Sequence, residues 1–95
     1  MKVTIQARHF NARDDLKKFV EKEVMRLERL YDRILEADVI LEGKLHRKEA
    51  QISIKVPGQT LVASDMADRF EIAAEAAVDK LEQQVKRYRD KMRKR

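Results

Sequence analysis

The stretch of sequence that decides the fold is Ala50-Gln51-Ile52-Ser53-Ile54-Lys55-Val56, followed by Pro57-Gly58. Apolar and polar residues alternate along it, which predicts a β-strand with one face buried and the other in water. The Pro-Gly pair predicts a reversal of the chain. Because L-Pro suits a type I or type II turn, we expect a loop longer than two residues. The stretch therefore predicts one strand of an antiparallel hairpin.

The same two-residue period recurs in residues 3–8, in residues 36–42 and, with less regular ends, in residues 60–66. Between the second and third of the four predicted strands, residues 43–49 are polar and basic, which predicts a hairpin connection. Apart from Ile40 and Val62, the apolar residues of the strands fall on one side, so we expect helices to cover only one face of the sheet.

Two segments have the apolar spacing of amphipathic helices. We expect the first to be capped by Asn11 and to continue to about Tyr31, and the second to be capped by Asp68 with Glu71 as the reciprocal partner. No Gly or Pro interrupts the second helix, which can reach about 27 residues and about 40 Å. A strand of seven residues covers only about 23 Å, so the end of this helix should overhang the sheet.

The resulting order, β-α-β-β-β-α, predicts an α+β fold with a four-stranded sheet and two helices packed on one face. The first two strands should be parallel, because a helix connects them by a right-handed crossover, and the remaining strands should form an antiparallel meander. The helix, three strands and final helix have the order of a double-stranded-RNA-binding domain, which is an analogy of fold alone.

Composition limits the class of protein. A chain of 95 residues has room for one core, so we expect residues 1–95 to form a single domain. It contains no Cys, no apolar run as long as a membrane span and no apolar stretch at its N-terminus. We therefore expect a soluble, cytoplasmic protein that is a monomer when free.

Motifs typical of enzymes are missing from the sequence. The two glycines, Gly43 and Gly58, are too far apart for a phosphate-binding loop, and the histidines, His9 and His46, have no second ligand at metal spacing. The acidic residues are spaced like surface partners of Lys and Arg on helices. We therefore expect no catalysis, no metal and no cofactor.

Positive charge is concentrated at the end of the chain. The net charge is +5, whereas residues 86–95 hold seven Lys or Arg and one acid, so the rest of the chain is close to neutral. Such a block is typical of a protein that binds phosphates, and the alternative is an ordinary solvated helix end.

Further cations recur at helical spacing. Stripes of this kind occupy one face of the first helix and two neighbouring faces of the second, which predicts that two packed helices present their cations on a single surface. The predicted strands carry no aromatic residue for base stacking, so contacts with phosphates and RNA shape are expected. The stripes comprise Lys18, Lys22, Arg26, Arg29 and Arg33 on the first helix, and Lys80, Arg87, Lys91 and Lys94 beside Lys86, Arg89 and Arg93 on the second.

Three stretches resemble a known family: residues 26–34 (RLERLYDRI), residues 78–87 (VDKLEQQVKR) and the strand that contains Leu61-Val62-Ala63-Ser64. Their sequence and order are similar to those of the ribosome hibernation promoting factor family, which includes ribosome-associated inhibitors and sigma-54 modulation proteins. The chain resembles the short form of this family.

The resemblance implies a partner and a mode of action. Members bind the small ribosomal subunit between head and body, overlap the mRNA path and the tRNA sites, and silence translation sterically in stationary phase or stress. The short form favours inactive ribosome dimers together with a separate dimerising factor. At the position after Glu82, where relatives commonly have Arg, this chain has Gln83. Combined with the stripes, the resemblance predicts these rRNA-binding residues: Lys18, Lys22, Arg26, Arg29, Lys80, Lys86, Arg87, Lys91 and Lys94.

Two other functions are compatible with the same residues. One is a general binder of structured RNA without a preference for ribosomes. The other is a protein-interaction domain that modulates a transcription factor.

Overall fold

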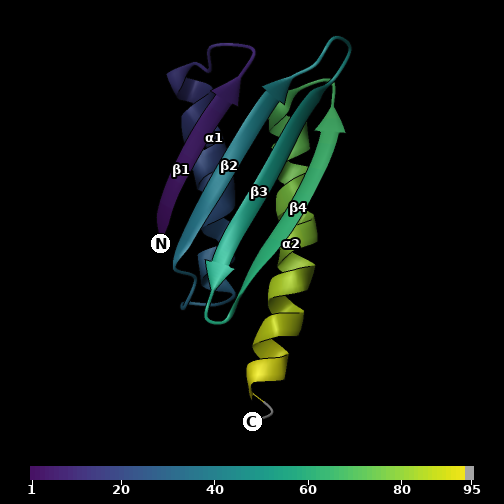
Figure 1. Cartoon of the computed structure of the whole chain (residues 1–95). Helices are drawn as coiled ribbons and strands as arrows, with labels where there is room; N and C mark the ends of the chain where they lie inside the picture. The colour runs from purple at the N-terminus through teal and green to yellow at the C-terminus, as the bar shows by residue number, and fades with distance from the viewer. Residues whose placement is uncertain (94–95) are drawn as a thin grey trace.

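A computed structural model describes residues 1–93 of the chain. A four-stranded sheet has the strand order β1-β2-β3-β4, in which β1 and β2 are parallel and the other neighbours antiparallel, as predicted. Figure 1 shows both helices behind the same face of the sheet. The elements are β1 (Lys2–Arg8), α1 (Asp14–Met25), the 3₁₀ helix η1 (Arg26–Arg29), β2 (Glu36–Gly43), β3 (Lys48–Val56), β4 (Gln59–Ala67) and α2 (Phe70–Arg93).

The register of the strands explains which side chains form the core. Ile5, Val39, Ile52 and Ala63 are directly paired across the four strands, and the last three are buried beneath the helices. This row repeats two residues away in each direction because successive side chains alternate between the faces. The alternation seen in the sequence therefore selects the covered face of the sheet.

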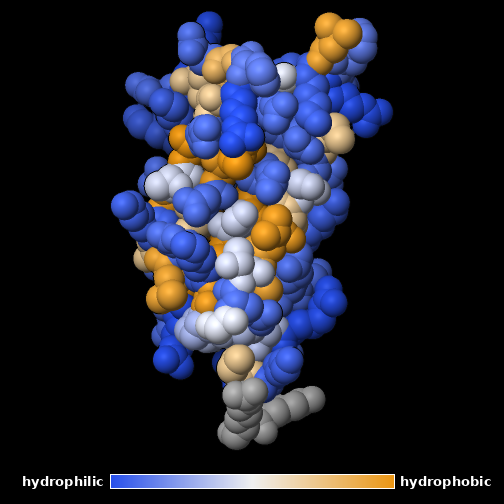
Figure 2. Space-filling view, viewed as in Figure 1, coloured by the Kyte–Doolittle hydropathy of each residue, from blue (hydrophilic) through white to orange (hydrophobic). Residues whose placement is uncertain are grey.

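The opposite face of the sheet is open. Figure 2 shows mostly hydrophilic side chains on this face, interrupted by separate hydrophobic patches. Among its apolar residues, Val62 and Met66 are exposed and Ile40 is half-buried. The expectation that helices cover one face only is confirmed.

The helix boundaries differ from those predicted. Arg13, not Asn11, is the N-cap of α1, and the α-helix ends at Met25, after which η1 continues the chain in tighter turns. The second helix begins at Phe70, one residue later than a cap at Asp68 requires. Both predicted caps were wrong because apolar spacing fixes the buried face of a helix better than its ends.

The turn between β3 and β4 contains only Pro57 and Gly58, so the prediction of a longer loop was wrong. Val56 pairs with Gln59 directly across the turn. Gly58 has a φ of +86°, which fits the second central position of a type II turn and suits the preceding L-Pro.

Two aromatic pairs hold α2 against the remainder of the molecule. Phe70 stacks on Phe10 with ring centroids 4.3 Å apart, and Tyr88 meets Tyr31 edge-on at 5.4 Å. The Tyr88 hydroxyl also donates a hydrogen bond to the Pro57 carbonyl oxygen. Beyond this point α2 extends past the end of the sheet, as predicted (Figure 1). The molecule is a rod of 46 × 21 × 18 Å.

Candidate nucleic-acid interface

One flank of α2 lies along β4. Lys80 donates from Nζ to the Ser64 carbonyl oxygen at 3.1 Å and lies 3.2 Å from Asp65 Oδ2. One turn further on, Gln84 Nε2 donates to the Val62 carbonyl oxygen at 2.9 Å. Because β4 is an edge strand, these side chains satisfy carbonyl groups that no neighbouring strand reaches. Lys80 therefore has a structural role at the sheet edge.

The pKa of the Asp65 carboxyl lies below its ordinary value. The backbone N–H of Met66 is the main cause, and the ammonium group of Lys80 adds to it. Both groups favour the ionised carboxylate. The pair is partly exposed, so it ties α2 to β4 without forming a buried charge.

Arg87 and Lys91 continue the same flank beyond Gln84. Together with Gln59 and Leu61 of β4 they line a shallow cleft of about 240 Å³. Both side chains are exposed, and neither forms an ion pair with any other residue in the range 1–93. Their charges are therefore available to a ligand.

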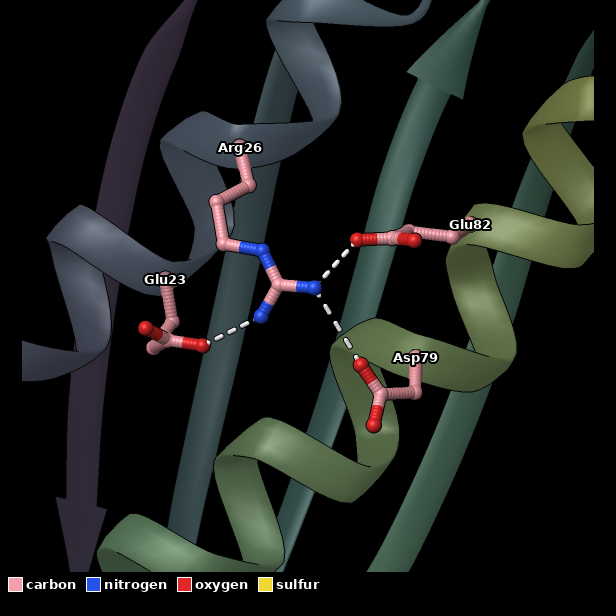
Figure 3. A network of polar contacts seen from close by, with 4 residues as sticks. All are labelled: Glu23, Arg26, Asp79 and Glu82. Atoms are coloured by element: carbon pink, nitrogen blue, oxygen red, sulfur yellow. Dashed lines mark hydrogen bonds and ion pairs between the residues drawn. The ribbon is translucent and has the colours of Figure 1, made fainter.

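The other flank of α2 faces η1 and α1, and the Arg26 side chain bridges the two sides (Figure 3). Its Nη1 lies 2.6 Å from Glu23 Oε1, while its Nη2 lies 3.2 Å from Asp79 Oδ1 and also donates to Glu82 Oε1. The hydrogen bond that Arg26 donates to the Glu23 carboxylate is the main cause of the raised pKa of Arg26. One guanidinium facing three carboxylates leaves this seam negatively charged, so Arg26 is poorly placed to bind a phosphate.

The remaining cations of α1 and η1 face solvent. Lys18, Lys22 and Arg29 are exposed, and none of the ion pairs within the described part of the chain involves them. On α2, Lys86 is half-buried and likewise without an ion pair among these residues. Lys94, the last predicted site residue, lies outside the described residues.

The family model described as Sigma 54 modulation protein / S30EA ribosomal protein matches residues 3–93. The chain belongs to this family. A relative of this S30EA family protein, the ribosome hibernation promoting factor of Azotobacter vinelandii, is 29% identical over 91 residues, which cover 96% of this chain and 85% of the relative. The predicted resemblance to hibernation promoting factors is confirmed.

Two solved structures resemble the S30EA family chain described here. The N-terminal domain of Thermus thermophilus Protein Y is 30% identical, with a TM-score of 0.85 over 93% of this chain and 99% of that one. A ribosomal subunit interface protein from Coxiella burnetii is 22% identical, with a TM-score of 0.88 over 95% and 99% of the two chains, and this likeness concerns the fold alone. The predicted four-stranded α+β fold is confirmed.

The structure of this S30EA family member divides the predicted cationic surface. Lys80, Arg87 and Lys91 lie on the β4 side of α2, whereas Arg26 meets the opposite side through Asp79. The predicted single surface is interrupted where Arg26 pairs with Asp79 and Glu82. At the end of the rod, cations from both parts of the chain do line common clefts: Arg29 with Arg89 and Arg93, and Arg33 with Lys91. The interruption arises because α2 carries Asp79 and Glu82 on the flank that faces η1.

Three arginines that were not among the predicted site residues lie together near the end of α2 in this S30EA family protein. Arg33, Arg89 and Arg93 line one cleft together with Arg29. A signal was present in the sequence, since Arg89 and Arg93 are spaced like Glu82 on one flank of α2. The position of Arg33 beside them depends on how η1 and the following loop fold.

No helix within residues 1–93 has the length and apolar character that crossing a membrane demands. Over the same range, the His, Asp and Glu side chains form no group of three or more that could hold a metal ion.

Proposed function

We propose that this protein is a ribosome hibernation factor that binds rRNA of the small subunit at the mRNA and tRNA channel. In this proposal it inhibits translation by occupying the channel, under stress or in stationary phase, and a separate factor assists any dimerisation of ribosomes. Membership of the S30EA family and the names of the curated relatives support the ribosome as partner. The site in the channel, the steric inhibition, the stress conditions and the dimerising factor are our inference.

The observation that carries the proposal is the set of exposed cations without carboxylate partners near the overhanging end of α2. Arg87 and Lys91 belong to this set, as does Arg29 on η1, at the same end of the rod. Charges that are not neutralised inside the protein can replace the counterions of RNA phosphates. If five to seven phosphates are contacted, the slope of log affinity against log salt should be about −4 to −6.

The shape and surface of the molecule support the proposed steric mode of inhibition. A rod of 46 × 21 × 18 Å with a polar sheet face and cations at one end can fill an RNA-walled channel without a chemical step. Phosphate contacts position such a protein but do not read sequence. Specificity in this proposal therefore comes from the shape of the channel.

The test is co-sedimentation with purified small subunits at low salt. The variant Arg87→Gln/Lys91→Gln removes two unpaired cations without creating repulsion within α2, and we expect it to bind less tightly. Arg13→Gln/Arg47→Gln is the matched control, because it removes two exposed, unpaired cations from the opposite end of the described rod. Equal loss of binding in the two variants would contradict docking through this end.

Two further outcomes separate the alternatives. Equal affinity of the wild-type protein for small subunits and for an unrelated RNA duplex would indicate a general binder of structured RNA. The family description also names sigma-54 modulation. Capture of purified sigma-54 that resists nuclease and outcompetes small subunits would favour the protein-interaction function instead.

A further inference from the structure

A cleft of about 480 Å³ lies between the η1–β2 connection and the last turns of α2. Its volume falls within the range typical of sites for small ligands. Four arginines from two separate parts of the chain contribute to its walls. The lining residues are Glu28, Arg29, Leu30, Tyr31, Asp32, Arg33, Arg89, Met92 and Arg93.

The walls of this arginine cleft are held in place from both sides. Arg89 donates from Nη1 to the Leu30 carbonyl oxygen at 3.4 Å, which joins α2 to the end of η1. Tyr31 packs edge-on against Tyr88, whose hydroxyl is hydrogen-bonded to the Pro57 carbonyl oxygen. A site with fixed walls loses little entropy when it binds a ligand.

The charge of the arginine cleft is positive. Glu28 lies 3.7 Å from the N-terminal ammonium group, and Arg89 is paired with Asp90 at 3.4 Å. Asp32 is the remaining carboxylate among the lining residues. Arg29, Arg33 and Arg93 are exposed and make no ion pair with another described residue. An anionic ligand is therefore favoured.

The chemistry of the cleft fits one class of ligand. Guanidinium groups bind phosphates through two parallel hydrogen bonds, and their planes stack on nucleobases. Leu30, Tyr31 and Met92 add apolar and aromatic surface beside them. A paired base inside a helix cannot enter such a cleft, whereas an unpaired nucleotide can.

We propose that the arginine cleft binds an unpaired nucleotide of RNA, with the phosphate on Arg33 and Arg93 and the base against the apolar side chains. This inference rests on the proposed function for the source of the RNA and adds a contact with a single strand to it. The strands carry no aromatic residue, so the open sheet face offers no aromatic platform, whereas the cleft places arginines beside Leu30, Tyr31 and Met92.

Fluorescence anisotropy with a labelled RNA hexamer of adenylates tests the proposal. Arg33→Gln/Arg93→Gln should weaken binding by about 5- to 100-fold, as expected for loss of a stacked and phosphate-bound nucleotide. The matched control is Arg13→Gln/Arg47→Gln, which removes the same charge from the opposite end of the described rod. It should weaken hexamer binding much less. Equal weakening in both variants would overturn the proposal, because net charge alone would then explain it.

A second probe separates the base from the phosphate. A hexamer of abasic ribose phosphates carries the same charge, and we expect the wild-type protein to bind it at least about 5-fold less tightly. Equal binding of the two hexamers would overturn the assignment of a base to the cleft. Thermal unfolding of the variants confirms that the exposed substitutions leave the protein folded.

The outcomes for the cleft and for the proposed function can be told apart. If the cleft variant binds the hexamer as the wild type does while the wild type co-sediments with small subunits, the cleft inference fails and the proposed function stands. If the wild type ignores ribosomes but discriminates the two hexamers through Arg33 and Arg93, the proposed function fails and the cleft stands.

Discussion

At the scale of single residues, the same side-chain type has different roles depending on its neighbours. Arg26 is engaged by three carboxylates, whereas Arg87, on the far flank of α2, is paired with none of the described residues. Sequence spacing places both residues on cationic stripes. The distinction arises from tertiary contacts, because Asp79 and Glu82 reach Arg26 only when α2 packs beside η1.

Removal of Arg26 should destabilise the protein. The variant Arg26→Gln leaves Glu23, Asp79 and Glu82 facing one another without a cation. The site is about one third exposed, so solvent screening limits the expected loss in free energy of unfolding to about 1 kcal/mol. Urea denaturation at low salt measures it, and the loss should shrink at 1 M salt.

The triple variant Arg26→Gln/Asp79→Asn/Glu82→Gln is the control for Arg26. It removes the mutual repulsion and should recover most of the lost stability. If the single variant is as stable as the wild type at low salt, the seam does not hold α2 against η1.

The Asp65 carboxyl should make stability depend on pH in the acid range. Because its folded pKa lies below the ordinary value of 3.8, its contribution is present above that value and is lost as the pH falls through the folded pKa. The group is partly exposed, so the contribution should stay below about 1 kcal/mol. Urea denaturation of the wild type and Asp65→Asn should differ at pH 7 and converge near pH 2.

At the scale of elements, α2 protects the edge of the sheet. Lys80 and Gln84 occupy the outward carbonyl groups of Ser64 and Val62, which another strand could otherwise bind. We expect Lys80→Ala/Gln84→Ala to increase self-association at high protein concentration. Sedimentation velocity measures this, and Gln83→Ala, an exposed residue on the same helix, should remain like the wild type. A monomeric double variant would show that the edge is protected in another way.

The strands of the sheet could be predicted from the sequence, whereas several boundaries could not. Alternation such as that of residues 50–56 reports directly which face of a strand is buried, and the crossover through α1 requires the parallel pair. The change from α1 to η1 at Arg26 leaves the apolar spacing almost intact, so the sequence pattern does not reveal it. The two-residue turn at Pro57 depends on the positive φ of Gly58, which the sequence permits but does not require.

The candidate site could be predicted only in part, because the sequence pattern shows which helix faces are basic but not how the helices pack. Cations at helical spacing identify which helix faces are basic, and Arg87 and Lys91 are exposed as such spacing implies. Ion pairs between elements depend on how the helices pack, which explains why the carboxylate partners of Arg26 and Lys80 were not foreseen. Whether these residues contact rRNA stays a prediction.

At the scale of the whole molecule, substitutions at the two ends of the rod should affect the salt dependence of ribosome binding differently. Each phosphate contact contributes about 0.7–0.9 to the log–log salt slope. The variant Arg87→Gln/Lys91→Gln should therefore reduce the slope of binding to small subunits by about 1.4–1.8. Arg13→Gln/Arg47→Gln, at the other end, should leave it unchanged. The measurement is a series of binding titrations at several salt concentrations. A reduced slope in Arg13→Gln/Arg47→Gln would contradict docking through one end of the rod.

The shortness of the Pro57–Gly58 turn has a consequence for the position of α2. The Pro57 carbonyl oxygen accepts the hydrogen bond of Tyr88, so the tip of the hairpin acts as an axial stop for the helix. One extra residue at the tip would displace this acceptor and remove the hydrogen bond that fixes α2 just before its overhanging end. The uncharged tip of the β3–β4 hairpin thus helps to fix the position of the basic end of α2.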